Sequence, residues 1–173
     1  MNLNSIEETL IDNTYKGFPG RQAPLPLKDI GQQGWNVLNE DLPLPLLVLH
    51  RNAMDNNLKL FESFAKENKI LHSPHGKTTM CPQIFDLQLK HGACGISAGN
   101  ISQLQVYRQF GVQNIFLANQ LIGRENILFV AKELQDDPSF GFHCLVDSAQ
   151  SIKLLNDTLK ESYPEVKIKV LLE

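Results

Sequence analysis

Short apolar runs alternate with helix-like patterns from Pro43 to the last residue, and this alternation constrains the fold most. The apolar runs predict strands over residues 46–49, 94–98, 112–118, 142–146 and 166–172, with another running from Ile70 into Lys77. Apolar residues at helical spacing predict helices over residues 52–67, 82–91, 101–110, 124–134 and 148–159. Strict alternation favours a parallel sheet with right-handed crossovers. The sequence therefore predicts an α/β fold with six strands and five helices.

Two α/β architectures accept such a chain. A doubly wound sheet is one, although no G-x-G-x-x-G follows the first apolar run. The other is a (β/α)8 TIM barrel, of which residues 42–173 would supply at most six strands. An incomplete barrel would present its first and last strands as apolar edges unless another chain pairs with them. We therefore expect a partial barrel that forms a homo-oligomer.

The first 41 residues lack this regularity. Seven glycines and prolines interrupt short apolar patches between Gly17 and Gly34, so the segment reads as an irregular N-terminal arm. One helical turn is expected within residues 5–12. Trp35, Val37 and Leu38 could dock the arm on a domain, and a loosely ordered leader is the alternative.

One amine stands out at a predicted strand end, in the stretch Ser73-Pro74-His75-Gly76-Lys77-Thr78-Thr79. A phosphate-binding loop would need G-x-x-x-x-G-K-[ST], but Leu71 stands where its first glycine belongs. A solvated surface lysine is the ordinary explanation of such a residue. His75 and Lys77 would share one strand face, and an amine beside an imidazole can serve as a nucleophile towards carbonyls.

Composition excludes several function classes. The net charge of -3 and the pI near 5.9 give no electrostatic footprint for nucleic acid. No apolar run approaches the length of a membrane span, and the acidic, polar first ten residues do not resemble a signal peptide. Three cysteines without C-x-x-C spacing favour reduced thiols, so a cytoplasmic location is expected.

Several motifs together resemble the start of the fold-type III pyridoxal-phosphate enzymes. These are Asp41-Leu42-Pro43-Leu44-Pro45-Leu46, Asn56, Pro74-His75-Gly76-Lys77-Thr78-Thr79-Met80, Gly95-Ile96, Phe110-Gly111-Val112 and Leu117-Ala118-Asn119-Gln120-Leu121. Residues 35–173 are most similar to the alanine racemase N-terminal-like barrel of the D-threonine aldolase and D-serine dehydratase branch, which includes amino acid deaminases. The resemblance implies an N-terminal fragment of such an enzyme.

The resemblance implies roles for particular residues. Lys77 would be catalytic and would hold pyridoxal 5'-phosphate as a Schiff base, with residues 46–49 lying outside the barrel. His75 would lie near the cofactor ring, or it is a hydrogen-bonded histidine of the barrel interior. Asn119 and Gln120 would contact substrate or cofactor, or they cap the next helix. His50, Arg51 and Asp147 follow strand ends and are weaker candidates.

The same resemblance places other parts of the site beyond residue 173. Phosphate-binding loops and a divalent metal would belong to later segments of a longer enzyme. Cys81, His91 and Cys94 have no zinc-like spacing, so no metal is assigned within this chain.

Two functions from different classes remain open at this stage. The chain is either the N-terminal part of a lyase for D-amino acids, acting by deamination, dehydration or aldol cleavage, or a non-catalytic module for cofactor binding or assembly. In the first case the fragment alone is expected to be inactive.

Overall fold

A computed structural model describes all of residues 1–173, which form two compact units. One unit comprises residues 2–57, and the other comprises residues 58–173 together with Met1. Helix α2 (Arg51–Glu67) carries the chain from the first unit into the second. All of the arm of residues 1–41 except Met1 falls within the first unit, and its status as a separate domain stays a prediction.

The first unit contains little regular structure. It consists of α1 (Asn4–Glu7), the strands β1 (Leu10–Ile11) and β2 (Leu25–Pro26), and the 3-10 helices η1 (Leu27–Gln32) and η2 (Val37–Asn39). β1 and β2 pair in antiparallel register. Buried Phe18 meets Trp35 edge to face, with 5.6 Å between ring centroids. Leu38 docks nothing, since 87% of its surface is exposed.

Residues 46–49 do not form the predicted strand. No backbone hydrogen bond joins them to another segment, and Leu47 is 95% exposed. A buried strand needs neighbours on both edges, and no part of this chain supplies them. The prediction was wrong because an apolar run shows only that its side chains favour burial. It does not show that another segment is there to bury them.

The second unit is built on a four-stranded parallel sheet in the order β3-β4-β5-β6. Its strands are β3 (Ile96–Ala98), β4 (Asn114–Gln120), β5 (Gly141–Val146) and β6 (Lys169–Leu172). The connecting helices are α3 (Pro82–Lys90), α4 (Ile101–Gln109), α5 (Arg124–Asp136) and α6 (Ala149–Ser162). The parallel α/β prediction is confirmed for this part of the chain.

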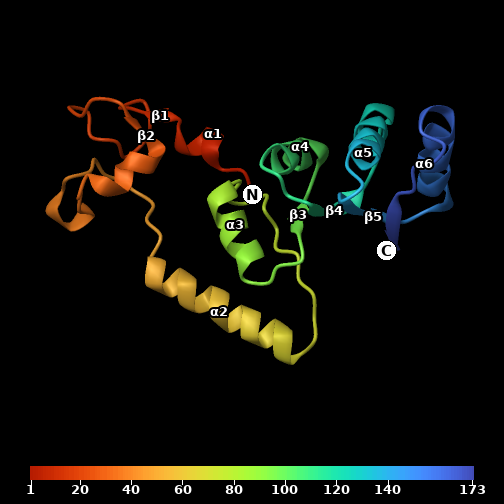
Figure 1. Ribbon diagram of the computed structural model, residues 1–173, viewed down its shortest axis with the longest axis horizontal. Helices are drawn as coiled ribbons and strands as arrows, with labels where there is room; N and C mark the ends of the chain where they lie inside the picture. The colour runs from red at the N-terminus through yellow and green to blue at the C-terminus, as the bar shows by residue number, and fades with distance from the viewer. The chain divides into compact units, whose positions relative to one another are not determined.

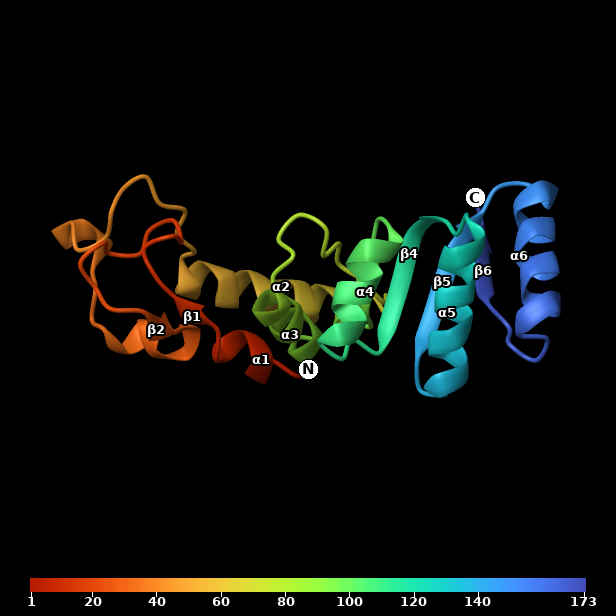
Figure 2. The ribbon, with the colours of Figure 1, turned by 90° about the horizontal axis from the view of Figure 1, so that it is seen from above.

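Helices α4, α5 and α6 all stand on the same side of the sheet (Figure 1). Viewed from above, α5 covers part of β5, and α4 stands beside β4 (Figure 2). A doubly wound fold would carry helices on both faces, whereas a barrel keeps them outside. The sheet is therefore arranged like a section of a barrel wall, although it does not close.

Side chains of the sheet alternate between these two faces. Ile115, Leu117, Phe142 and Cys144 are buried, whereas the intervening residues of β4 and β5 are only partly covered. Ile127 and Val130 of α5, both fully buried, belong to the same apolar core. This core joins the four-stranded sheet to the helices that cover it.

Helix ends follow their sequence signals. Pro82 opens α3, and Gly92 ends it with a φ of +86°. The Asn100 side chain accepts a hydrogen bond from the Gln103 amide at 3.0 Å, and Ser148 forms a capping box at the start of α6. No helix has the length and apolar character needed to cross a membrane.

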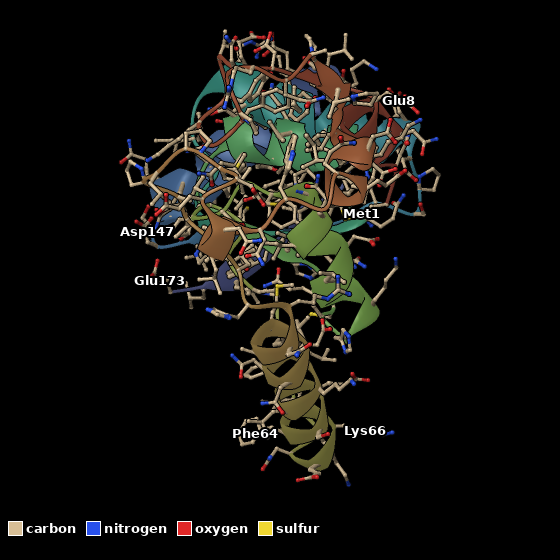
Figure 3. All side chains as sticks on the ribbon, turned by 90° about the vertical axis from the view of Figure 1, so that its left-hand side faces the viewer. Met1, Glu8, Phe64, Lys66, Asp147 and Glu173 are labelled. Atoms are coloured by element: carbon tan, nitrogen blue, oxygen red, sulfur yellow. The ribbon has the colours of Figure 1, made fainter.

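Helix α2 forms as predicted, but its apolar stripe is not covered. Ala65 is its one buried residue, and Phe64, labelled in Figure 3, is half exposed. The apolar spacing thus predicted the helix correctly without showing what would pack against it.

Candidate active site at the carboxyl ends of the strands

Residues 72–76 lie along β3 as an irregular edge segment. The Cys94 amide donates to the His72 carbonyl at 2.9 Å, and the Ser97 amide donates to the Pro74 carbonyl at 2.8 Å. The Gly76 amide donates to the Ser97 carbonyl at 3.0 Å, and His75 forms an isolated parallel bridge with Ser97. The predicted strand running into Lys77 is thus reduced to this short segment, since Leu71 before it is 85% exposed and unpaired.

Lys77 occupies the first position of a tight turn directly after this segment. The Met80 amide donates to the Gly76 carbonyl at 2.9 Å and closes the turn. Met80 has a φ of +43°, a conformation that a residue with a side chain adopts only at a cost of about 1–3 kcal/mol. Backbone strain of this kind gathers at functional sites, where the surrounding structure enforces it. The backbone around Lys77 is therefore held on both sides.

His75 belongs to a row of paired residues that crosses the sheet. The register runs from His75 to Ser97, Phe116, His143 and Lys169. Paired residues of parallel strands share a face, so this row lies opposite the helices. Partial burial and the charge of Lys169 lower the pKa of His143. The strand alternation that predicted a common face for His75 and Lys77 ends at Gly76, where the turn begins.

The side chain of Lys77 reaches towards the end of β3. A Cβ atom on Gly99 would lie 3.7 Å from the Lys77 Cδ, so the stem of the lysine passes beside this glycine. The Asn119 side-chain amide donates to the Gly99 carbonyl at 2.8 Å. Gly99 thus lies between the stem of Lys77 and the side chain of Asn119. Sequence reasoning missed Gly99, although a glycine directly after a strand would have indicated a close approach.

Asn119 and Gln120 are the last two residues of β4. Asn119 lies within an irregularity in the pairing of β4 with β5, and Gln120 follows it and pairs with Leu145. Gln120 donates from Nε2 to the Glu173 carboxylate at 3.2 Å. Neither residue caps the next helix, because α5 begins after Gly123 and has no side-chain cap. The capping alternative is therefore excluded.

A cavity of about 250 Å³ opens at this edge of the sheet. Gly99, Asn119 and Gln120 contribute to its lining, as do Leu117 and Ile122. A second, more open hollow of about 420 Å³ lies farther along the same edge, between Gln120 and the start of α6. Asp147 and Ser148 line it. Asn119, Gln120 and Asp147 thus lie where parallel sheets bind ligands, whereas the lining of the two cavities includes neither His75 nor Lys77.

Asp147 and Glu173 lie beside each other at the ends of β5 and β6 (Figure 3). The Glu173 amide donates to the Val146 carbonyl at 3.0 Å. His50 and Arg51 belong to the other compact unit, where Arg51 forms an ion pair with Asp55 at 2.9 Å. These two residues are therefore not placed at the site.

Two comparisons with known proteins find D-threonine aldolases. Over 79 residues, 46% of its length, the chain is 32% identical to the D-threonine aldolase of an Arthrobacter species. It also superposes on the crystal structure of D-threonine aldolase from Filomicrobium marinum with a TM-score of 0.67 and 26% identity, over 76% of the chain. The resemblance to the D-threonine aldolase branch is confirmed.

A further structural likeness concerns the fold alone. D-threo-3-hydroxyaspartate dehydratase from Delftia sp. HT23 superposes with a TM-score of 0.64 over 76% of the chain, at 19% identity. The chain spans 21% of the Arthrobacter aldolase and about a third of each of these two solved structures. No family model matches it.

The cysteines and His91 form no metal cluster. The Cys94 thiol donates to the His72 carbonyl at 3.1 Å, and the Cys81 thiol donates to the side chain of Gln83 at 3.2 Å. His91 pairs with Glu62 at 2.8 Å. No group of three histidine, cysteine or acidic side chains is arranged to hold a metal ion.

Proposed function

We propose that Lys77 binds pyridoxal 5'-phosphate as a Schiff base in an enzyme that acts on D-amino acids by deamination, dehydration or aldol cleavage. One observation carries this proposal. Lys77 stands in a turn that is hydrogen-bonded on both sides, at the edge of a parallel sheet where such folds perform chemistry. The sequence match to D-threonine aldolase supports the class of enzyme proposed.

The residues present fit the reactive end of this cofactor. An aldehyde requires an accessible amine, and Lys77 is exposed, with its stem beside Gly99. The cavity that Gly99 lines, at about 250 Å³, approaches the lower end of the range for small-ligand pockets, roughly 300 Å³. The amides of Asn119 and Gln120 provide neutral polar groups at its rim.

The covalent step is a condensation that this chain's amine can perform. Lys77 would hold the cofactor covalently through Nζ, and the two protons of its neutral amine would leave with the aldehyde oxygen as water. When bound, the pyridine ring supplies an electron sink for a bond that breaks at the substrate α-carbon. Asn119, fixed by Gly99, would orient polar groups of cofactor or substrate. His75 would lie near the ring.

Reductive trapping tests the proposal. The chain is incubated with pyridoxal phosphate, reduced with borohydride and analysed by peptide mass spectrometry. We expect the label on the peptide that contains Lys77 and its loss in Lys77→Arg, which keeps the charge but cannot condense. Lys153→Arg, at an exposed position of α6, is the matched control and should leave the labelling unchanged. Equal labelling of wild type and Lys77→Arg would refute the assignment.

Assembly with a second copy is a separate proposal, and it keeps the non-catalytic alternative open. β6 forms an unpaired edge whose Val170, Leu171 and Leu172 are exposed, and such edges favour pairing with another chain. A chain that associates but gives no borohydride label would favour an assembly module over an enzyme. The D-amino-acid substrate, the activity of a longer enzyme, a metal there and a cytoplasmic location stay predictions.

A further inference from the structure

The backbone directly before Lys77 is in contact with a buried tyrosine of α4. A Cβ atom on Gly76 would lie 2.5 Å from the Tyr107 hydroxyl oxygen, 2.8 Å from its Cζ and 2.9 Å from the Ile96 Cγ2. Real side chains do not accept such distances, so glycine is required at position 76 by this contact. Because Gly76 has no positive φ, its backbone conformation alone would accept other residues.

Tyr107 is itself firmly held. Its side chain is fully buried and meets Phe85 of α3 edge to face, with 5.0 Å between centroids. The hydroxyl lies 3.5 Å from the Ser97 carbonyl, which also accepts the Gly76 amide hydrogen at 3.0 Å. Burial raises the pKa of Tyr107 to about 12, so the hydroxyl remains protonated at neutral pH. The ring cannot move aside without disturbing α3, α4 and β3 together.

We propose that Tyr107 is a positioning residue for Lys77. Its hydroxyl packs against Gly76 and thereby fixes the position of the Lys77 backbone at the edge of the sheet. This inference rests on the proposed function of Lys77. The long side chain transmits any displacement of its backbone to Nζ, and a misplacement of about 1 Å can cost roughly a hundredfold in reactivity. Nothing in the sequence spacing links residues 76 and 107, which only the packing of α4 brings together.

Tyr107→Phe provides the first test, because it removes only the hydroxyl. The readouts are the cofactor concentration at half-maximal borohydride labelling of Lys77, the pH midpoint of the bound cofactor's absorbance, and the thermal unfolding midpoint. We expect the half-maximal concentration to rise by roughly three- to tenfold and the pH midpoint to shift, since positioning losses of this size accompany small displacements.

Two controls separate positioning from stability. Val130 belongs to the same apolar core as Tyr107 but lies on α5. Val130→Ala should therefore lower the unfolding midpoint and leave the cofactor concentration at half-maximal labelling unchanged. Tyr163→Phe removes a hydroxyl at the end of α6 and should alter neither readout. If Val130→Ala weakens labelling as much as Tyr107→Phe does, the role of Tyr107 is merely structural and the inference is overturned.

A double-variant cycle gives the sharper test. Gly76→Ala should weaken labelling strongly, because its Cβ meets the Tyr107 hydroxyl. Adding Tyr107→Phe removes the closest of the three contacts, so the double variant should label better than Gly76→Ala alone. The same substitution would then impair the wild type and improve the variant. Independent effects at the two positions, multiplying in the double variant, would overturn the inference.

The outcomes also separate the two proposals. If Tyr107→Phe does not change the labelling of Lys77, the proposed function is retained and only the positioning role is overturned. No labelling at Lys77 in the wild-type chain at saturating cofactor overturns both.

Discussion

Arg108 offers the clearest quantitative prediction, because one side chain joins three parts of the second unit. It is 12% exposed and donates from Nε to Glu133 at 2.7 Å and from Nη2 to Asp137 at 2.8 Å. Its Nη1 donates to the Val112 carbonyl at 3.2 Å, and its Cζ lies 4.1 Å from the centre of the Phe140 ring. Arg108→Met removes all of these contacts while keeping most of the apolar stem.

The size of the loss follows from the surroundings of each contact. A hydrogen bond to a charged group contributes about 1.5–3 kcal/mol, but Glu133 is 27% exposed and water compensates part of it, leaving about 1 kcal/mol. The bond to the Val112 carbonyl adds about 1 kcal/mol. The ring contact adds about 0.5–1 kcal/mol. With nothing counted for the pair with Asp137, we expect Arg108→Met to lower the free energy of unfolding by about 2.5–3 kcal/mol.

Urea unfolding at pH 7, followed by circular dichroism, measures this loss. Arg108→Lys keeps the charge but loses the fork of donors, so it should recover only part of the stability. Lys153→Met removes an exposed ion pair with Asp157 on α6, which water screens, so it should leave the urea midpoint nearly unchanged. An Arg108→Met protein within about 0.5 kcal/mol of wild type would refute the reasoning.

Four further predictions concern other features. Hydrogen bonds from the Ser139 hydroxyl and, second, from Arg108 lower the pKa of Asp137 to about 2, below its ordinary 3.8. The stability that this carboxylate contributes is therefore complete above pH 3.8 and is lost as the pH falls through 2. Ser139→Ala should raise the pKa of Asp137, which NMR would measure. Burial raises the pKa of Cys144 to about 11, so a thiol reagent at pH 8 should modify exposed Cys94 and reach Cys144 only on unfolding, which mass spectrometry would show. Asn100→Ala should lower the unfolding free energy by about 1 kcal/mol in urea, whereas a cap that contributes nothing would leave it unchanged. Light scattering should detect self-association, and a clean monomer would contradict it.

The elements of the second unit could be predicted from local signals. Pro82, Gly92 and Asn100 act within one helical turn of their own position, so their effects did not depend on the rest of the chain. The apolar runs that became β4 and β5 are covered by helices close to them in sequence, and their burial matched the prediction. The position of Lys77 at the end of a strand could be predicted from local signals in the same way.

Long-range coverage could not be predicted in this way. The run at residues 46–49 has the composition of a buried strand but finds no partner, and the strand expected from Ile70 pairs only near His75. Whether such a run is covered depends on segments far away in the chain, which composition does not reveal. The apolar stripe of α2 is uncovered for the same reason.

The sequence by itself determined the alternation of strands and helices, the helix ends and the lysine that the motif around His75 singles out. Only the tertiary structure decided that all three crossover helices lie on one face, that Gly99 brings Lys77 towards Asn119, and that Tyr107 leaves room for nothing larger than glycine at position 76. The physical reason is the sequence separation over which each kind of interaction acts. Caps and periodicity act between residues a few positions apart, whereas close packing joins residues such as 76 and 107 that no local pattern connects.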